Sequence, residues 1–491
     1  MQINQQTTTY AREMLLAAIF LQFALCWCAG TKKAVIAYPS ILEERMAGAT
    51  LVLKVTEDIT LNLERSSVLA DKLLFVTSGK EEHHVERVDT SFIQKDIYHD
   101  THRQSSVMVR TVGGALQVEG ILDSELRIKP LLQAPRSLDG QIAHEVYEVE
   151  EKADPREMRT NFRTTNNRER IQRKSSPNRG NNRKNHAAGN RQQGGDAFKV
   201  ELHVISDNQH QRSFKKNEEL IGYMAVMLNA VNLRYSDMAR PKVSFMLVGI
   251  TRSKDDVFET RVKSYLHADK TLNGLWKYSE NGRVPGNPDM VYLSTGLDMV
   301  NASNGQLDQG LTGLAYIGKV CTKYKVGLGE DTATTYSGTH TMAHELCHLL
   351  GSPHDTTPEC PWEEGFMMSY VDGGLKKYRL SPCSQKSVRN IYRNLRPECI
   401  QVKTQMNYMT KYKKYPGQTL RDSYYCKKAV KKPGKKFFVR RKEELNQKCK
   451  MQCCYTEQRT TTCWTVNILS GMSCGEGKTC KRGVCGNHTF P

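Results

Sequence analysis

Two histidines with a glutamate between them form the most chemically specific pattern in this sequence of 491 residues. His344 and His348 are four positions apart, so on a helix of 3.6 residues per turn both imidazoles lie on one face and can bind a single zinc ion. Glu345 lies beside them without being a ligand. It is therefore the candidate general base for a water molecule that the metal activates.

A third histidine completes the set of candidate ligands. Gly351 can adopt the left-handed conformation that ends a helix, and the chain can then turn back to bring His354 to the same metal. Three protein ligands leave the fourth zinc position open for water, whereas structural sites usually fill all four with protein groups. An isolated pair of histidines with this spacing is often just two surface side chains. The glycine, the third histidine and a methionine pair at 367–368 make the full pattern far more restrictive.

The complete pattern reads HELCHLLGSPHD over residues 344–355 and GFMMSYVDGGLKKYRLSPCS over residues 365–384. It resembles the reprolysin (adamalysin or ADAM-like) family of metzincin proteases, and it looks most similar to secreted salivary reprolysins of ticks. The resemblance implies a secreted zinc metalloendopeptidase that cuts extracellular proteins, such as matrix or clotting proteins. It also implies that Met368 is the Met-turn residue, which packs beneath the metal without binding it, and that Asp355 anchors the chain behind the site.

Two residues near the motif depart from the reprolysin pattern. Tyr370 follows Met368 by two positions, where the related astacins and serralysins place a tyrosine that stabilises the oxyanion; simple packing is the alternative role. Cys347 stands where reprolysins usually have glycine, about 80° around the helix from the midpoint of the two histidines. We interpret its side chain as a small buried hydrophobic group and not as a fourth ligand.

The resemblance implies further pairings and a second metal. Cys321 with Cys399 resembles the long reprolysin disulfide, and Cys360 with Cys383 resembles the shorter one. Glu201, Asp289 and the carbonyl group of Cys399 fall where reprolysins bind a structural calcium ion. Val402 stands where an asparagine ligand is expected, and the loss of a ligand weakens such a site without excluding it.

The composition favours a secreted product. Arg12 precedes an apolar run from Met14 to Trp27, so residues 1–30 read as a signal peptide, and no later run is apolar enough for a membrane anchor. Thirteen cysteines cluster between Cys321 and Cys485, which indicates a disulfide framework made in an oxidising compartment. Asn301 and Asn487 begin glycosylation sequons. The net charge of +19 favours acidic surfaces as partners without identifying one.

Residues 31–155 form the first candidate folded segment. Short alternating stretches at 50–55 and 115–118 predict strands, and the segment carries no catalytic pattern. By resemblance it is a reprolysin pro-segment that assists folding and keeps the enzyme latent. It contains no cysteine, so a thiolate that blocks zinc, which many relatives use, cannot operate here. His83 and His84 are interpreted as exposed polar residues and not as substitutes for that thiolate.

Residues 156–196 are basic and polar. Eleven lysines and arginines between Arg156 and Arg191 stand against two glutamates, a composition that cannot bury an apolar core. We interpret the segment as a processing linker, in which a convertase would cut at the dibasic-type sequence 170–173 or at the competing sequence 156–159. A nucleic-acid-binding arm is the alternative, which the upstream signal peptide and the scarcity of aromatic residues disfavour.

Residues 197–402 should form the catalytic domain, with an α/β (α+β) metzincin fold in which long helices pack on a mixed twisted sheet. Alternating apolar residues predict strands at 198–205, 243–250 and 290–294, and helices at 218–237, 259–278 and 385–394. The helix at 218–237 carries a methionine-rich apolar stripe on one side. The run 313–318 looks like the edge strand along which metzincins bind an extended peptide substrate.

Residues 403–491 should form a small module held by four disulfides among its eight cysteines. Its end, residues 467–486, resembles the cysteine-rich modules that follow ADAMTS-type protease domains. The basic run at 427–442 is either a solvated loop or an attachment site for heparin-like polyanions or matrix. A non-catalytic binding protein acting through this module is therefore the alternative to a protease.

Overall fold

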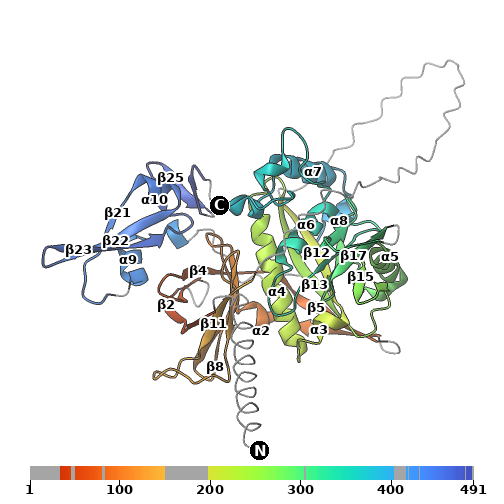
Figure 1. The fold of residues 1–491 in the computed structure, drawn as a ribbon, viewed down its shortest axis with the longest axis horizontal. Helices are drawn as coiled ribbons and strands as arrows, with labels where there is room; N and C mark the ends of the chain where they lie inside the picture. Colours follow the sequence, from red (N-terminus) through yellow and green to blue (C-terminus); the bar gives the residue numbers. More distant parts are fainter. Residues whose placement is uncertain are drawn as a thin grey trace, which may run out of the picture.

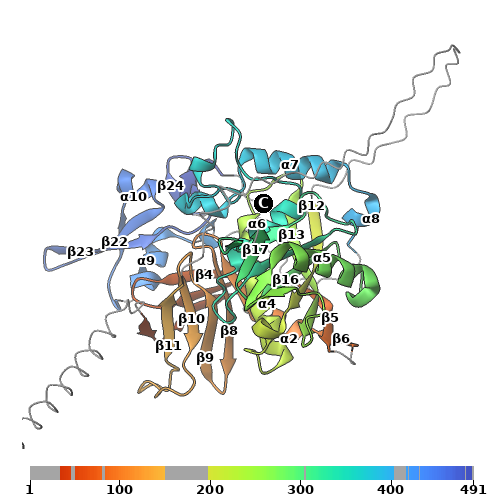
Figure 2. The same ribbon diagram turned by 45° about the vertical axis from the view of Figure 1, so that its right-hand side comes forward.

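The computed structural model describes residues 34–45, 50–79, 83–149, 197–303, 306–402, 416–418, 420–430, 432–481 and 483–488. The expected signal peptide at 1–30 and the expected linker at 156–196 lie outside these ranges. In the views of Figures 1 and 2, an N-terminal sheet, a catalytic part built on a second sheet and a C-terminal part can be distinguished.

The catalytic part is organised around a seven-stranded sheet within the described residues, in the order β19-β20-β16-β12-β13-β5-β6. Its central strands run parallel and are buried on both faces, which explains their continuous apolar sequences. At one end of the sheet, the edge strand β19 pairs antiparallel with β20. The strands that the catalytic sequence contributes are β12 (Ala197–Ser206), β13 (Lys242–Ser253), β16 (Met290–Thr295), β19 (Gly313–Ala315) and β20 (Val326–Glu330).

Four longer helices pack with this sheet: α4 (Asn217–Arg234), α5 (Ala268–Tyr278), α6 (Thr339–Leu349) and α7 (Pro382–Arg393). Ser381 caps α7, since its side chain accepts a hydrogen bond from the Ser384 backbone, and Pro382 follows at the first helical position. The mixed α/β architecture expected for this region is thereby confirmed.

The expected helix at 259–278 is correct only in its second half. Residues 261–262 and 265–267 instead form the short strands β14 (Arg261–Val262) and β15 (Tyr265–His267), which pair with each other. β15 also pairs with β17 (Met299–Ser303), and β17 with β18 (Gln306–Asp308). Leu266 and His267 are buried in this small sheet, so tertiary pairing overrides the helical pattern there.

Most of the N-terminal segment forms the N-terminal sheet, which has nine strands within the described residues. Its neighbours are antiparallel. The strands are β1 (Val35–Ala37), β2 (Ser40–Arg45), β3 (Thr50–Lys54), β4 (Thr60–Arg65), β7 (Ile97–Asp100), β8 (Ser105–Val112), β9 (Ala115–Ile121), β10 (Leu126–Pro130) and β11 (His144–Glu148).

Two N-terminal strands belong to the catalytic sheet instead. β5 (Leu69–Ser78) runs parallel to β13, and β6 (His83–Asp89) pairs with β5 on its outer side. In Figure 1, β5 lies beside β13 among the catalytic strands. The alternating pattern of the N-terminal segment predicts strands but not the sheet to which each strand belongs.

The C-terminal part is small and rich in disulfides. Cys426–Cys453, Cys449–Cys480, Cys454–Cys463 and Cys474–Cys485 join its elements. These elements are α9 (Asp422–Val430), β21 (Phe438–Arg440), α10 (Glu443–Gln447), β22 (Lys450–Glu457), β23 (Thr460–Asn467), β24 (Ser473–Gly475), β25 (Lys478–Lys481) and β26 (Val484–Gly486). In the part of the chain that the structure describes, no helix has the length and apolar character needed to cross a bilayer.

Candidate metal centre

Helix α6 carries the first two candidate ligands and ends where the sequence indicates. His344 and His348 face each other one turn apart, with ring centroids 4.8 Å apart. The helix stops before Gly351, whose φ of 102° lies in the left-handed region. A Cβ atom at Gly351 would lie 2.2 Å from Cγ1 of Ile391, so glycine is required at this position for space as well as for conformation.

The third histidine, His354, lies against the first two. Nε2 of His354 lies 2.9 Å from Nε2 of His344 and 3.2 Å from Nε2 of His348. The backbone N–H of Asp355 donates to the carbonyl of Met368 over 2.8 Å, which ties the returning chain to the methionine turn. The three imidazoles form one of the groups of side chains whose donor atoms lie close enough together to share a metal ion.

Hydrogen bonds on the far side of two rings fix their tautomers. Nδ1 of His344 lies 2.9 Å from the carbonyl oxygen of Met367, and Nδ1 of His348 lies 2.7 Å from that of Ser352. A carbonyl oxygen only accepts, so both Nδ1 atoms carry the proton and donate it. Their Nε2 atoms therefore present lone pairs, and these converge with Nε2 of His354.

This arrangement fits a zinc ion. The Nε2 atoms of His344 and His348 lie 2.9 and 3.2 Å from Nε2 of His354, which suits nitrogens that share one ion at the usual Zn–N distance of about 2.0–2.1 Å. Burial and the two neighbouring histidines lower the pKa of His348 well below its usual value, so its imidazole is neutral and ready to bind a metal. Without a cation, the converging lone pairs would repel one another.

Tyr370 contacts the site from behind a ligand. Its hydroxyl oxygen lies 3.0 Å from Nδ1 of His354, the ring nitrogen that faces away from the other two histidines. Its ring packs tilted against the His354 ring at a centroid distance of 4.8 Å. In this arrangement the hydroxyl is placed to orient the imidazole of a candidate ligand. The expected contact with the oxyanion stays a prediction.

Glu345 lies between the active-site helix and the sheet edge. It is only 3% exposed, and a Cβ atom at Gly313 would lie 2.6 Å from its Oε1 atom. Strand β19 therefore passes directly over the carboxylate, and glycine at position 313 permits this approach. The expected edge strand at 313–318 is shorter than predicted, since its pairing with β20 ends at Ala315.

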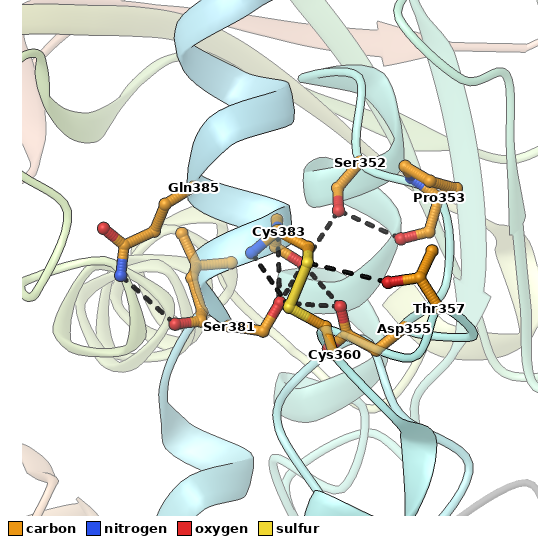
Figure 3. Close-up of a disulfide and its surroundings, with 10 residues drawn as sticks. Ser352, Pro353, Asp355, Thr357, Cys360, Ser381, Cys383 and Gln385 are labelled. Atoms are coloured by element: carbon orange, nitrogen blue, oxygen red, sulfur yellow. Dashed lines mark hydrogen bonds between the residues drawn. A yellow bond between two sulfur atoms is a disulfide. The ribbon is translucent and has the colours of Figure 1, made fainter.

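Asp355 holds the loop behind the ligands through two serines that the sequence reading missed. Ser381 Oγ donates to Asp355 Oδ1 over 2.6 Å, and Ser384 Oγ lies 3.3 Å from the same oxygen. Ser352 Oγ donates to Ser384 Oγ over 2.9 Å. Figure 3 shows Ser352, Asp355 and Ser381 around the disulfide between Cys360 and Cys383. The cap position of Ser381 before Pro382 is the only sequence signal that could have indicated this network.

Methionine and cysteine packing supports the base of the site. Met367 and Met368 are both fully buried. Cys347 is a buried free thiol, and burial raises its pKa to about 12. It lies on α6 away from the three imidazoles and is absent from the group that they form.

Two of the residues expected as calcium ligands, Glu201 and Asp289, are in contact with each other. Asp289 Oδ2 accepts from the Glu201 backbone N–H over 2.9 Å, and Cys321 is joined to Cys399 by a disulfide. Val402 is 40% exposed. Calcium binding therefore stays a prediction. So does glycosylation, for which Asn487 is exposed and Asn301 lies half-buried in β17.

Known proteins resemble this chain in its catalytic region and beyond. Residues 196–390 match the model of a reprolysin family described as metallo-peptidase family M12. The chain is 24% identical to the venom metalloproteinase antarease of Tityus serrulatus over 413 residues, which span 78% of this chain and 97% of that protein. An antarease-like venom metalloproteinase of Tityus trivittatus is 26% identical over 346 residues, or 64% of this chain and 82% of its own.

Two further similarities are weaker or shorter. A protein of Bombyx mori, described as like a disintegrin and metalloproteinase with thrombospondin motifs, is 30% identical over 210 residues, which cover 38% of this chain and 30% of that one. Metalloproteinase-II of Bacteroides fragilis covers 76% of this chain and 94% of its own with a TM-score of 0.33 at 12% identity, too low to define a fold.

The fold, the histidine set and these matches define a metalloendopeptidase of the metzincin class. Within that class, residues 196–390 match the reprolysin type, in agreement with the resemblance inferred from the motif. The finer likeness to tick salivary enzymes stays a prediction.

Proposed function

We propose that this protein is a secreted zinc endopeptidase that hydrolyses extracellular proteins, with matrix and clotting proteins such as fibrinogen as its expected substrates. The observation that carries the proposal is that the Nε2 atoms of His344 and His348 lie 2.9 and 3.2 Å from Nε2 of His354, on the helix that also carries Glu345. The relatives named as venom metalloproteinases support secretion, together with the signal peptide expected at residues 1–30.

Strand β19 supplies the place where a peptide can bind. It lies at the end of the catalytic sheet and pairs through only one side with β20 among the described strands. An extended substrate can add to its other side through main-chain hydrogen bonds, which do not depend on the substrate's side chains. Because β19 crosses over Glu345, the bound chain lies next to the carboxylate.

Each residue of the site has its own role in the proposed hydrolysis. Zinc, when held by His344, His348 and His354, supplies the Lewis acid that acidifies a water molecule and polarises the scissile carbonyl. Glu345 takes the proton from that water as general base and passes it to the leaving amine. The Met367 and Ser352 carbonyls keep two imidazoles in the tautomer that leaves Nε2 free.

The proposal is tested by incubating the processed protein with gelatin, fibrinogen and a set of random-sequence peptides. We expect cleavage that is abolished by a zinc chelator and restored by added zinc. A folded, zinc-loaded protein that cleaves none of these substrates would support the alternative, a binding protein that acts through its C-terminal part. Binding by that part should survive removal of zinc.

A specific observation supports polyanions as additional partners. In the C-terminal part, Arg421, Lys427, Lys435 and Lys436 line one open groove together with Tyr424 and Phe437. Closely spaced cations beside aromatic faces suit a sulfated polysaccharide, which offers repeated negative charges along a carbohydrate chain. We expect the protein to elute from immobilised heparin at lower salt when Lys427 and Lys436 are both changed to glutamine. Unchanged elution would argue against this groove.

A further inference from the structure

The N-terminal segment, residues 34–149, completes the catalytic sheet. β5 lies between β13 and β6, and its register runs from the pair Leu247 and Leu69 to the pair Ser253 and Ser78. The fully buried side chains of β5 are those of Leu69, Ala70, Leu73, Phe75 and Val76. A strand with neighbours on both sides and a buried apolar face is an interior part of a sheet and not a cover that lies on it.

The same segment also covers helix α4. Ser106 Oγ on β8 donates to the carbonyl of Val226 over 2.7 Å, and Asn229 Nδ2 donates to Ser106 Oγ over 3.0 Å. A Cβ atom at Gly222 would lie 2.5 Å from Cε of Met108, so the helix and the N-terminal sheet are in close contact. As a result α4 is buried around its whole circumference, although the sequence predicts one apolar side.

A third set of contacts reaches the turn that precedes the active-site helix. The fully buried Arg127 donates from Nε to the carbonyl of Thr335 over 3.1 Å, and the Tyr147 hydroxyl donates to that of Thr334 over 3.2 Å. Thr334 and Tyr336 both have positive φ, at 72° and 59°, so this turn is strained and needs outside support. Without the segment, these two carbonyls would lose their donors.

The segment also contacts the C-terminal part. Thr101 Oγ1 donates to Ser470 Oγ over 3.1 Å, and the Tyr424 hydroxyl donates to Glu43 Oε1 over 3.0 Å. Figures 1 and 2 both show the C-terminal part beside the N-terminal sheet. The N-terminal segment therefore joins the two other parts of the molecule.

From these contacts we propose that residues 34–149 remain bound as a non-covalent subunit after the chain is cut between residues 150 and 196. A pro-segment that only blocks a cleft can leave a finished fold behind. Departure of this segment would instead expose the β13 edge and one face of α4. The turn before α6 would lose the two hydrogen bonds that the segment donates to it. The proposal concerns the association of the two pieces and does not depend on the proposed catalysis.

The test uses the full chain with residues 170–173 replaced by the recognition sequence of a site-specific protease. After complete cleavage, the pieces are diluted to nanomolar concentration in high salt and analysed by size-exclusion chromatography and native mass spectrometry. We expect a single 1:1 complex, with the amides of β5 and β13 still protected from hydrogen exchange. Free N-terminal piece in solution, whether or not the remainder stays folded, overturns the proposal.

Matched variants locate the contact. Ser106→Asp places a charge against α4, whereas Thr111→Asp makes the same change at an exposed position of the same strand. We expect the cut Ser106→Asp complex to dissociate at least tenfold faster than the Thr111→Asp complex, which should match the unsubstituted protein. Circular dichroism of the uncut variants verifies folding. Equal dissociation of the two variants contradicts the assigned interface.

Discussion

The hydroxyl oxygen of Tyr370 lies 3.0 Å from Nδ1 of His354, on the opposite side of that ring from the converging Nε2 atoms. The contact makes the tyrosine a partner of a candidate metal ligand. Groups in this position orient the imidazole and raise its basicity, and their loss typically weakens metal affinity by about 10–100-fold.

Tyr370→Phe should therefore lower zinc affinity by about tenfold while keeping most of kcat at saturating zinc. Competition with a chromogenic chelator measures the affinity, and peptide hydrolysis in excess zinc measures kcat. Tyr455→Phe, in the C-terminal part, serves as the control. A large loss of kcat with unchanged zinc affinity would instead support the oxyanion role suggested by astacins.

Asp355→Ala should destabilise the loop behind the metal. The change leaves the hydroxyls of Ser381 and Ser384 without their buried acceptor, at a cost of about 1–3 kcal/mol in the free energy of unfolding. Asp355→Asn should cost less, because its side-chain oxygen can still accept from Ser381. Urea unfolding of the three proteins measures the difference. An alanine variant as stable as the unsubstituted protein would contradict the anchoring role.

The thiol of Cys347 should be chemically inert in the folded protein. It is buried, and burial raises its pKa to about 12, so the reactive thiolate is scarce at neutral pH. We expect no reaction with a disulfide reagent at pH 8 under native conditions and reaction of one thiol per processed chain in guanidinium chloride. Rapid native labelling would show that α6 opens readily.

His203 should make the fold sensitive to acid. Burial, followed by the charges of His83 and Lys325, lowers its pKa from 6.5 to about 3, and its Nε2 lies 2.8 Å from Thr251 Oγ1. As the pH falls, His203 is therefore protonated at a higher pH in the unfolded state than in the folded state. The stabilisation from neutral His203 is present above pH 6.5 and is lost as the pH falls toward 3.

Between pH 7 and pH 5 this loss amounts to about 2 kcal/mol. His203→Gln, which can still bond Thr251, should reduce the difference in unfolding free energy between these two pH values by about that amount. His84→Gln, at an exposed position of β6, should leave the difference unchanged. An equal pH dependence in both variants would contradict this assignment.

Local patterns in the sequence predicted which three histidines lie together, because they are only ten positions apart in the chain. His344 and His348 share a helix face through their spacing, and the conformational need for glycine at 351 follows from the turn that ends the helix. The strands β12, β13 and β16 were also predictable, since their apolar runs are long and continuous.

Contacts between distant residues could not be predicted in the same way. Asp355 and Ser381 are 26 positions apart, and no periodicity connects them. Nothing in the sequence of residues 69–78 indicates that β5 pairs with β13, more than 160 positions further along the chain. The helix expected from residue 259 failed for a similar reason, because β15 is defined by its pairing with β17.

The central claim is that Glu345 is the general base of a zinc peptidase. The most direct measurement is kcat/KM for one fluorogenic peptide with the unsubstituted protein and with Glu345→Gln, both at one bound zinc ion per chain by metal analysis. Glutamine keeps the size of the side chain but cannot take a proton, so we predict a loss of at least about 100-fold at equal zinc content. Equal rates in the two zinc-loaded proteins would contradict the proposed mechanism.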